Sequence, residues 1–165
     1  MQSCHQRLGF SHPTSRQGLA TTTTPYGVPD EKTVDPALYA LTYGATFVAR
    51  GSAGNPEMLR AFITEALQHK GFAFVDVLSA CPSFNKVDTP ESYKANTEEI
   101  SEEHVRSYFN KAMSIVINGV GGKMALGVLY QVDRPTLNDT LEAINKKANG
   151  SDSFDLNKVV DLYKP

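Results

Sequence analysis

The sequence predicts an α/β fold in which a short parallel sheet is flanked by helices. Two successive segments carry this prediction, because each reads as a capped helix followed by a short apolar strand. Strands that alternate with helices along a chain pair side by side in the same direction. The length of 165 residues is sufficient for one hydrophobic core.

The first segment, VDPALYALTYGATFVARG, begins with a helix cap. Asp35 is a favoured N-cap residue, and Pro36 suits the first helical position because the N–H that it lacks would have no partner there. Gly44 is expected to end the helix. The apolar residues 45–50 then predict the first strand.

The second segment, GNPEMLRAFITEALQHKGFAFVDVL, repeats this order. Asn55 and Pro56 begin a helix whose apolar residues recur at helical spacing, and Gly71 ends it. The nearly continuous apolar run 72–78 is typical of a strand that is covered on both faces. His69 lies in the last turn, where a helix favours a cation, so we expect it to cap the helix rather than to act in catalysis.

The rest of the chain predicts shorter elements. A charged stretch is expected to form a helix over residues 101–117, on which His104 would be solvated. The segment NGVGGKMALG lacks the full spacing of a phosphate-binding loop, so GVGGK is expected to be a turn. Residues 124–133 predict a third strand, and residues 134–150 a last helix with Thr136 as its cap.

Composition excludes several classes of function. The formal net charge of −2 is too close to neutral for a nucleic-acid-binding protein. No apolar run is long enough to span a bilayer, and the first residues lack the apolar core of a signal peptide, so a cytoplasmic location without a membrane partner is expected. Cys4 and Cys81 are too few for a disulfide framework and are expected to be free thiols.

Cys81 is the candidate site residue that the pattern singles out. It follows the predicted second strand, and ligands of parallel sheets gather beyond the carboxyl ends of strands. A Cys-Pro pair is also common where a cysteine binds an iron–sulfur cluster, although a cluster normally needs four thiolates. The residues alone therefore leave two interpretations, a cluster ligand or a small buried side chain.

Four stretches resemble a known family in order and spacing. TTTTPYG, DPALYALTYGATFVARG, HKGFAFVDVLSACPSFN and LGVLYQVDRPTL are similar to the C-terminal half of the β subunit of 2-oxoacid:ferredoxin oxidoreductases, above all those of the 2-oxoglutarate type. The resemblance covers residues 21–137 and implies a partial thiamine-diphosphate-binding-type fold. Residues 1–34 would be an irregular N-terminal remnant of the thiamine-binding domain, and residues 35–165 the C-terminal α/β region of the β subunit.

The resemblance also implies an activity. The family oxidatively decarboxylates a 2-oxoacid with coenzyme A and passes the electrons to ferredoxin, using thiamine diphosphate, Mg²⁺ and a 4Fe–4S cluster. Cys81 would be one ligand of that cluster, while Pro82 and Asn85 would shape its loop and the contacts around the ligand. No catalytic residue is assigned to this chain.

The sequence departs from the family in what it lacks. The other three cluster cysteines, including a Cys-x-x-Cys, belong to the family's N-terminal half, as does the GDG and Asn motif that holds Mg²⁺ and the diphosphate. The expected partners are therefore that missing half, the α subunit and ferredoxin, with coenzyme A and a 2-oxoacid as substrates. Alone, this chain is expected to hold neither thiamine diphosphate nor an intact cluster, and to be inactive.

Two interpretations of the whole chain follow. It is expected to be a truncated, frame-shifted or split β subunit that works as a component of the oxidoreductase. The alternative is a non-catalytic remnant or subunit-interaction domain, which keeps the α/β core and its packing surface but carries out no chemistry.

Overall fold

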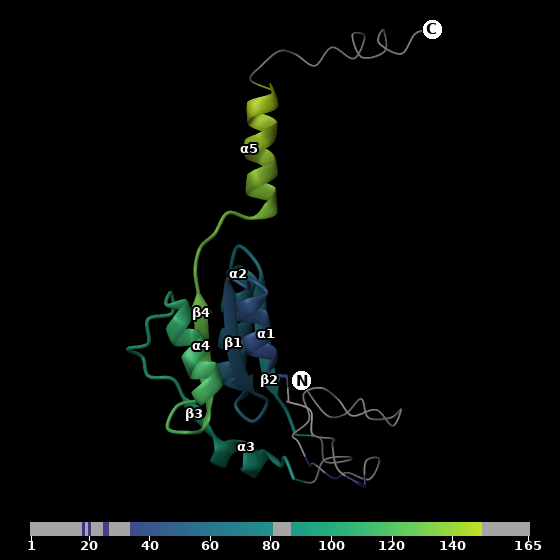
Figure 1. Cartoon of the computed structure of the whole chain (residues 1–165), viewed down its shortest axis with the longest axis vertical. Helices are drawn as coiled ribbons and strands as arrows, with labels where there is room; N and C mark the ends of the chain where they lie inside the picture. The colour runs from purple at the N-terminus through teal and green to yellow at the C-terminus, as the bar shows by residue number, and fades with distance from the viewer. Residues whose placement is uncertain (1–17, 19, 21–24, 27–33, 81–86, 150–165) are drawn as a thin grey trace. The chain divides into compact units, whose positions relative to one another are not determined.

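The computed structural model describes residues 18, 20, 25–26, 34–80 and 87–149. The chain divides into two compact units, Met1–Asp133 and Arg134–Pro165. In the described part, the first unit contains helices α1 to α4 and strands β1 to β4, and the second contains helix α5 (Figure 1).

The elements of the first unit follow one another as helix, strand, helix, strand and then a second group of the same kind. Their bounds are α1 Pro36–Thr42, β1 Phe47–Ser52, α2 Pro56–Gln68, β2 Ala73–Leu78, α3 Pro90–Asn96, β3 Thr97–Glu99, α4 Phe109–Asn118 and β4 Met124–Gln131. The second unit contains α5, Leu137–Asn149. In the described part of the chain, no helix is both long and apolar enough to cross a membrane.

The four strands form one sheet in the order β2-β1-β4-β3. The parallel pairing of β1 with β2 was expected and is confirmed, with Phe47 opposite Ala73 and Ser52 opposite Leu78. Strand β4 instead runs antiparallel to β1, while β3 and β4 are parallel to each other. The α/β class is thus confirmed, but the sheet is mixed rather than purely parallel.

The position of α3 explains why β4 is reversed. Residues from the end of β1, from α3 and from the start of β3 line one common groove, so β3 begins at the edge of the sheet where β1 ends. Strand β3 therefore runs against β1. Helix α4 then connects β3 to β4 as a crossover between parallel strands. Because β4 is parallel to β3, it also runs antiparallel to β1.

Helices cover both faces of the sheet. On one face, α1 and α4 enclose the larger core cluster, whose buried members are Ala37, Ala40, Leu41, Ala45, Val48, Ala112, Val116, Ala125, Leu129 and Tyr130. On the other face, α2 packs over Phe47, Ala49 and Val128. No side chain of α2 is fully buried, so this helix lies on the surface of the unit.

The C-terminus of α1 is closed by the glycine that the sequence indicated. Gly44 has a φ of 95°, which L-residues rarely adopt. Its N–H donates to the carbonyl of Leu41 at 3.1 Å, and the N–H of Ala45 donates to the carbonyl of Ala40 at 2.9 Å. These two bonds form a Schellman motif and turn the chain directly into the buried approach to β1.

The helix expected over residues 101–117 begins only at Phe109, and the sequence did not predict α3 or β3. Residues before Phe109 instead bond to the sheet, since the carbonyl of Arg106 accepts from the N–H of Gln131 at 2.9 Å. His104 is half-buried rather than solvated, and its Nε2 lies 2.8 Å from the carbonyl oxygen of Leu129. Tertiary pairing with β4 thus overrides helix formation here.

Two local predictions are confirmed. Thr136 caps α5 reciprocally, because its Oγ1 accepts from the N–H of Asp139 at 3.2 Å and Asp139 Oδ2 accepts from the N–H of Thr136 at 2.8 Å. The GVGGK segment is a tight turn, closed by hydrogen bonds of 2.9 Å in both directions between Val120 and Lys123.

We predict that Gly44→Ala lowers the free energy of unfolding by about 1 kcal/mol, because a Cβ is disfavoured at this backbone conformation. Among the described residues other than its two chain neighbours, none has an atom within 4 Å of a Cβ at this position, so the cost comes from the backbone conformation. Urea unfolding followed by circular dichroism measures it.

Gly54→Ala is the matched control, because Gly54 is outside the left-handed region and its Cβ would make an ordinary 3.5 Å contact with Ser52. We expect that change to stay within about 0.5 kcal/mol of wild type. Equal unfolding midpoints for the two variants would contradict the assignment of strain to Gly44.

Candidate functional site

The carboxyl ends of β1 and β2 lie side by side. Ser52 is opposite Leu78, and the N–H of Ala53 donates to the carbonyl of Leu78 at 2.8 Å. The chain leaves this edge through Ser79 and Ala80, which directly precede Cys81. Open α/β sheets bind their ligands at such edges, so the candidate site is expected beyond the ends of β1 and β2.

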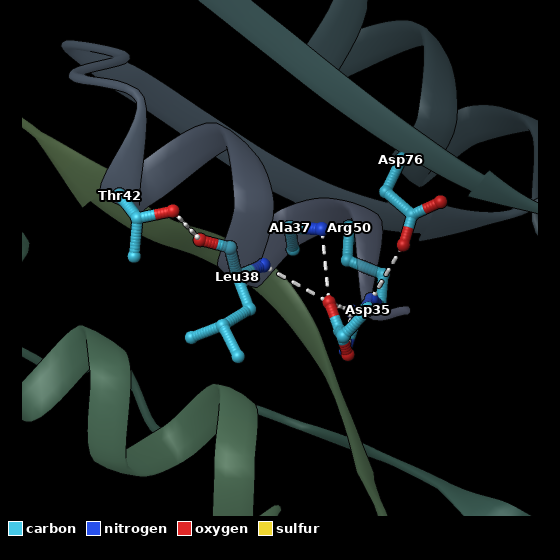
Figure 2. Close-up of polar contacts among 6 residues, drawn as sticks. All are labelled: Asp35, Ala37, Leu38, Thr42, Arg50 and Asp76. Atoms are coloured by element: carbon cyan, nitrogen blue, oxygen red, sulfur yellow. Dashed lines mark hydrogen bonds and ion pairs between the residues drawn. The ribbon is translucent and has the colours of Figure 1, made fainter. Parts of the chain in front are cut away.

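A buried ion-pair network stands just before this edge (Figure 2). Arg50 of β1 donates from Nη2 to both carboxylate oxygens of Asp35, at 2.6 and 2.7 Å, and from Nε to Oδ2 of Asp76 at 2.8 Å. Arg50 is 1% exposed and Asp76 is 3% exposed. Burial takes the guanidinium out of water, and the two carboxylates compensate this desolvation.

Asp35 serves two elements at once. Its Oδ1 accepts from the N–H groups of Ala37 and Leu38, at 2.8 and 3.0 Å, and so caps α1 as the sequence predicted (Figure 2). The same carboxylate binds Arg50. The network therefore fixes the start of α1 to β1 and, through Asp76, to β2.

An open groove of about 830 Å³ begins at the same edge. Its lining comes from the end of β1 and the β1–α2 connection, from α3, from β3 and from β4. The lining residues are Ser52, Gly54, Asn55, Pro90, Glu91, Lys94, Thr97, Glu98, Glu99 and Leu126. Three of these side chains are acidic and one is basic. The backbone N–H of Glu91 and the Thr89 hydroxyl hold the pKa of the Glu91 carboxyl below its ordinary value. Such a lining disfavours a diphosphate.

The candidate cluster ligand and its neighbours cannot be placed in this groove. Cys81, Pro82 and Asn85 lie outside the described residues, so their assigned roles stay predictions. The described part of the chain contains no group of three or more His, Cys, Asp or Glu side chains that could hold a metal ion. These residues therefore do not fit a Mg²⁺ or iron–sulfur site without ligands from elsewhere.

His69 has a structural role, as expected from its position at the end of α2. Its backbone N–H donates to the carbonyl of Glu65 at 3.0 Å, and its Nε2 lies 2.8 Å from Thr46 Oγ1. The ring also packs against Phe47, with the centroids 5.6 Å apart. Gly71 leaves room for this contact, because a Cβ there would overlap the Thr46 hydroxyl.

Sequence reasoning did not identify the network of Arg50 with Asp76. The signal was present, because each is a charged residue inside an otherwise apolar strand, TFVARG and FVDVL. Charged side chains are almost never fully buried unless they are paired. Opposite charges in two adjacent predicted strands therefore indicate a buried ion pair.

Comparison with known proteins places these features in a family. Residues 81–146 match the family of the C-terminal region of the pyruvate ferredoxin oxidoreductase beta subunit. Residues 5–77 match the family described as thiamine pyrophosphate enzyme, C-terminal TPP binding domain. The 2-oxoglutarate synthase subunit KorB of Methanocaldococcus jannaschii is 31% identical over 139 residues, which are 84% of this chain and 51% of the relative.

The chain belongs to the β subunits of 2-oxoacid:ferredoxin oxidoreductases and matches their C-terminal part.

Further members of this family agree. The 2-oxoacid:ferredoxin oxidoreductase β subunit of Saccharolobus solfataricus is 35% identical over 58% of this chain and 31% of its own length. A solved structure of 2-oxoglutarate:ferredoxin oxidoreductase from Magnetococcus marinus, with 2-oxoglutarate, coenzyme A and succinyl-CoA bound, matches with a TM-score of 0.84 and 42% identity. That match covers 93% of this chain and 52% of the other. The chain thus spans about half the length of the M. jannaschii relative and of the M. marinus chain.

We predict that Arg50→Met lowers the free energy of unfolding by about 3–5 kcal/mol, because it removes one charge of a buried ion pair and leaves the Asp76 carboxylate buried. Adding Asp76→Asn removes the buried carboxylate charge as well, so the double variant should lose less than the single one. Urea unfolding of the full chain measures both changes.

Arg106→Met is the matched control. Arg106 pairs with Glu65 at 2.9 Å, but the two side chains are 46% and 38% exposed, so the loss should stay below about 1 kcal/mol. If Arg50→Met cost no more than this exposed pair, Arg50 would not be the organising charge of the unit.

Proposed function

We propose that this chain forms the C-terminal part of the β subunit of a coenzyme-A-dependent 2-oxoacid:ferredoxin oxidoreductase. The enzyme would oxidatively decarboxylate a 2-oxoacid, with 2-oxoglutarate favoured, and transfer the electrons to ferredoxin. The observation that carries the proposal is the match to the M. marinus enzyme over nearly the whole chain at 42% identity. The KorB relatives support 2-oxoglutarate as the substrate, since they are named 2-oxoglutarate synthase subunits.

The cofactors of the proposed enzyme would be thiamine diphosphate, Mg²⁺ and a 4Fe–4S cluster. When bound, thiamine diphosphate supplies the electron sink for decarboxylation and the cluster carries electrons singly. Since the described residues offer no metal site of their own, Mg²⁺ and the diphosphate would be held by the N-terminal half of the subunit. Cys81 would add one thiolate to the cluster.

The described residues of this chain would hold the strand that leads to Cys81 in place. Asp76 is fixed to Arg50 only five positions before Cys81, in the strand that leads to it. A strand anchored by a buried ion pair presents the following loop in a defined position, which a cluster ligand requires. The α subunit, the N-terminal half of the β subunit and ferredoxin would be its protein partners.

A non-catalytic subunit-interaction domain is the second candidate. One observation favours it: Tyr39 and Tyr43 are 63% and 74% exposed on the surface of α1. Large exposed aromatic side chains are typical of protein interfaces. The two candidates differ in whether a complex that contains this chain holds iron and turns over.

We predict that Cys81→Ser abolishes both iron binding and activity in a complex of this chain with the α subunit and the N-terminal half of the β subunit. Replacing one thiolate of four removes a cluster ligand. Iron and acid-labile sulfide content, together with 2-oxoglutarate- and coenzyme-A-dependent reduction of a viologen dye, are the measurements.

Cys4→Ser is the control and should keep both iron and activity. Undiminished iron in Cys81→Ser would remove Cys81 from the ligand set. A wild-type complex with neither iron nor dye reduction would instead support the non-catalytic alternative.

A further inference from the structure

We draw no further inference here: the strongest candidate, the exposed apolar face that Leu137, Leu141 and Ile144 form along helix α5, carries none because nothing in the described part of the chain shows what covers it.

Discussion

The buried guanidinium of Arg50 is the constraint on which the first unit depends. Its position between Asp35 and Asp76 connects the start of α1 with the parallel strands β1 and β2. An unpaired charge at this depth would cost several kcal/mol, so these segments must lie together whenever the unit is folded. Asp35 also caps α1, so one side chain both pairs with the Arg50 charge and accepts from the free N–H groups of the helix.

This constraint acts next to the carboxyl ends of β1 and β2, where the candidate site lies. Arg50 and Asp76 stand opposite each other shortly before β1 and β2 end, and the groove begins where those strands stop. The described part of this segment ends at Ala80, directly before the candidate thiolate of Cys81. The described lining of the groove has three acidic side chains and one basic side chain, which disfavours a diphosphate there.

The sheet differs on the two sides of the β1–β2 pair in what lies next to each strand. Beyond β1, strand β4 with α4 completes both the hydrogen bonding and the core, whereas beyond β2 the aromatic rings of α1 and Phe72 remain exposed. Exposed aromatic side chains that contact one another form an apolar surface of the kind that protein interfaces use.

The sequence by itself determined the local features: the caps at Asp35, Asn55 and Thr136, the helix end at Gly44 and the parallel pair of strands. Each depends on residues within a few positions of one another, apart from the strand pair, which follows from the alternation of helix and strand. The residue pattern also singled out Cys81 beyond the end of a strand, and the family resemblance gave it the role of a candidate cluster ligand. Only the tertiary structure decided the direction of β4, the burial of His104 and the partners of Arg50. The contacts of His104 with Leu129 and of Arg50 with Asp76 join segments 25 and 26 positions apart, where Coulomb attraction and hydrogen bonding outweigh local propensity.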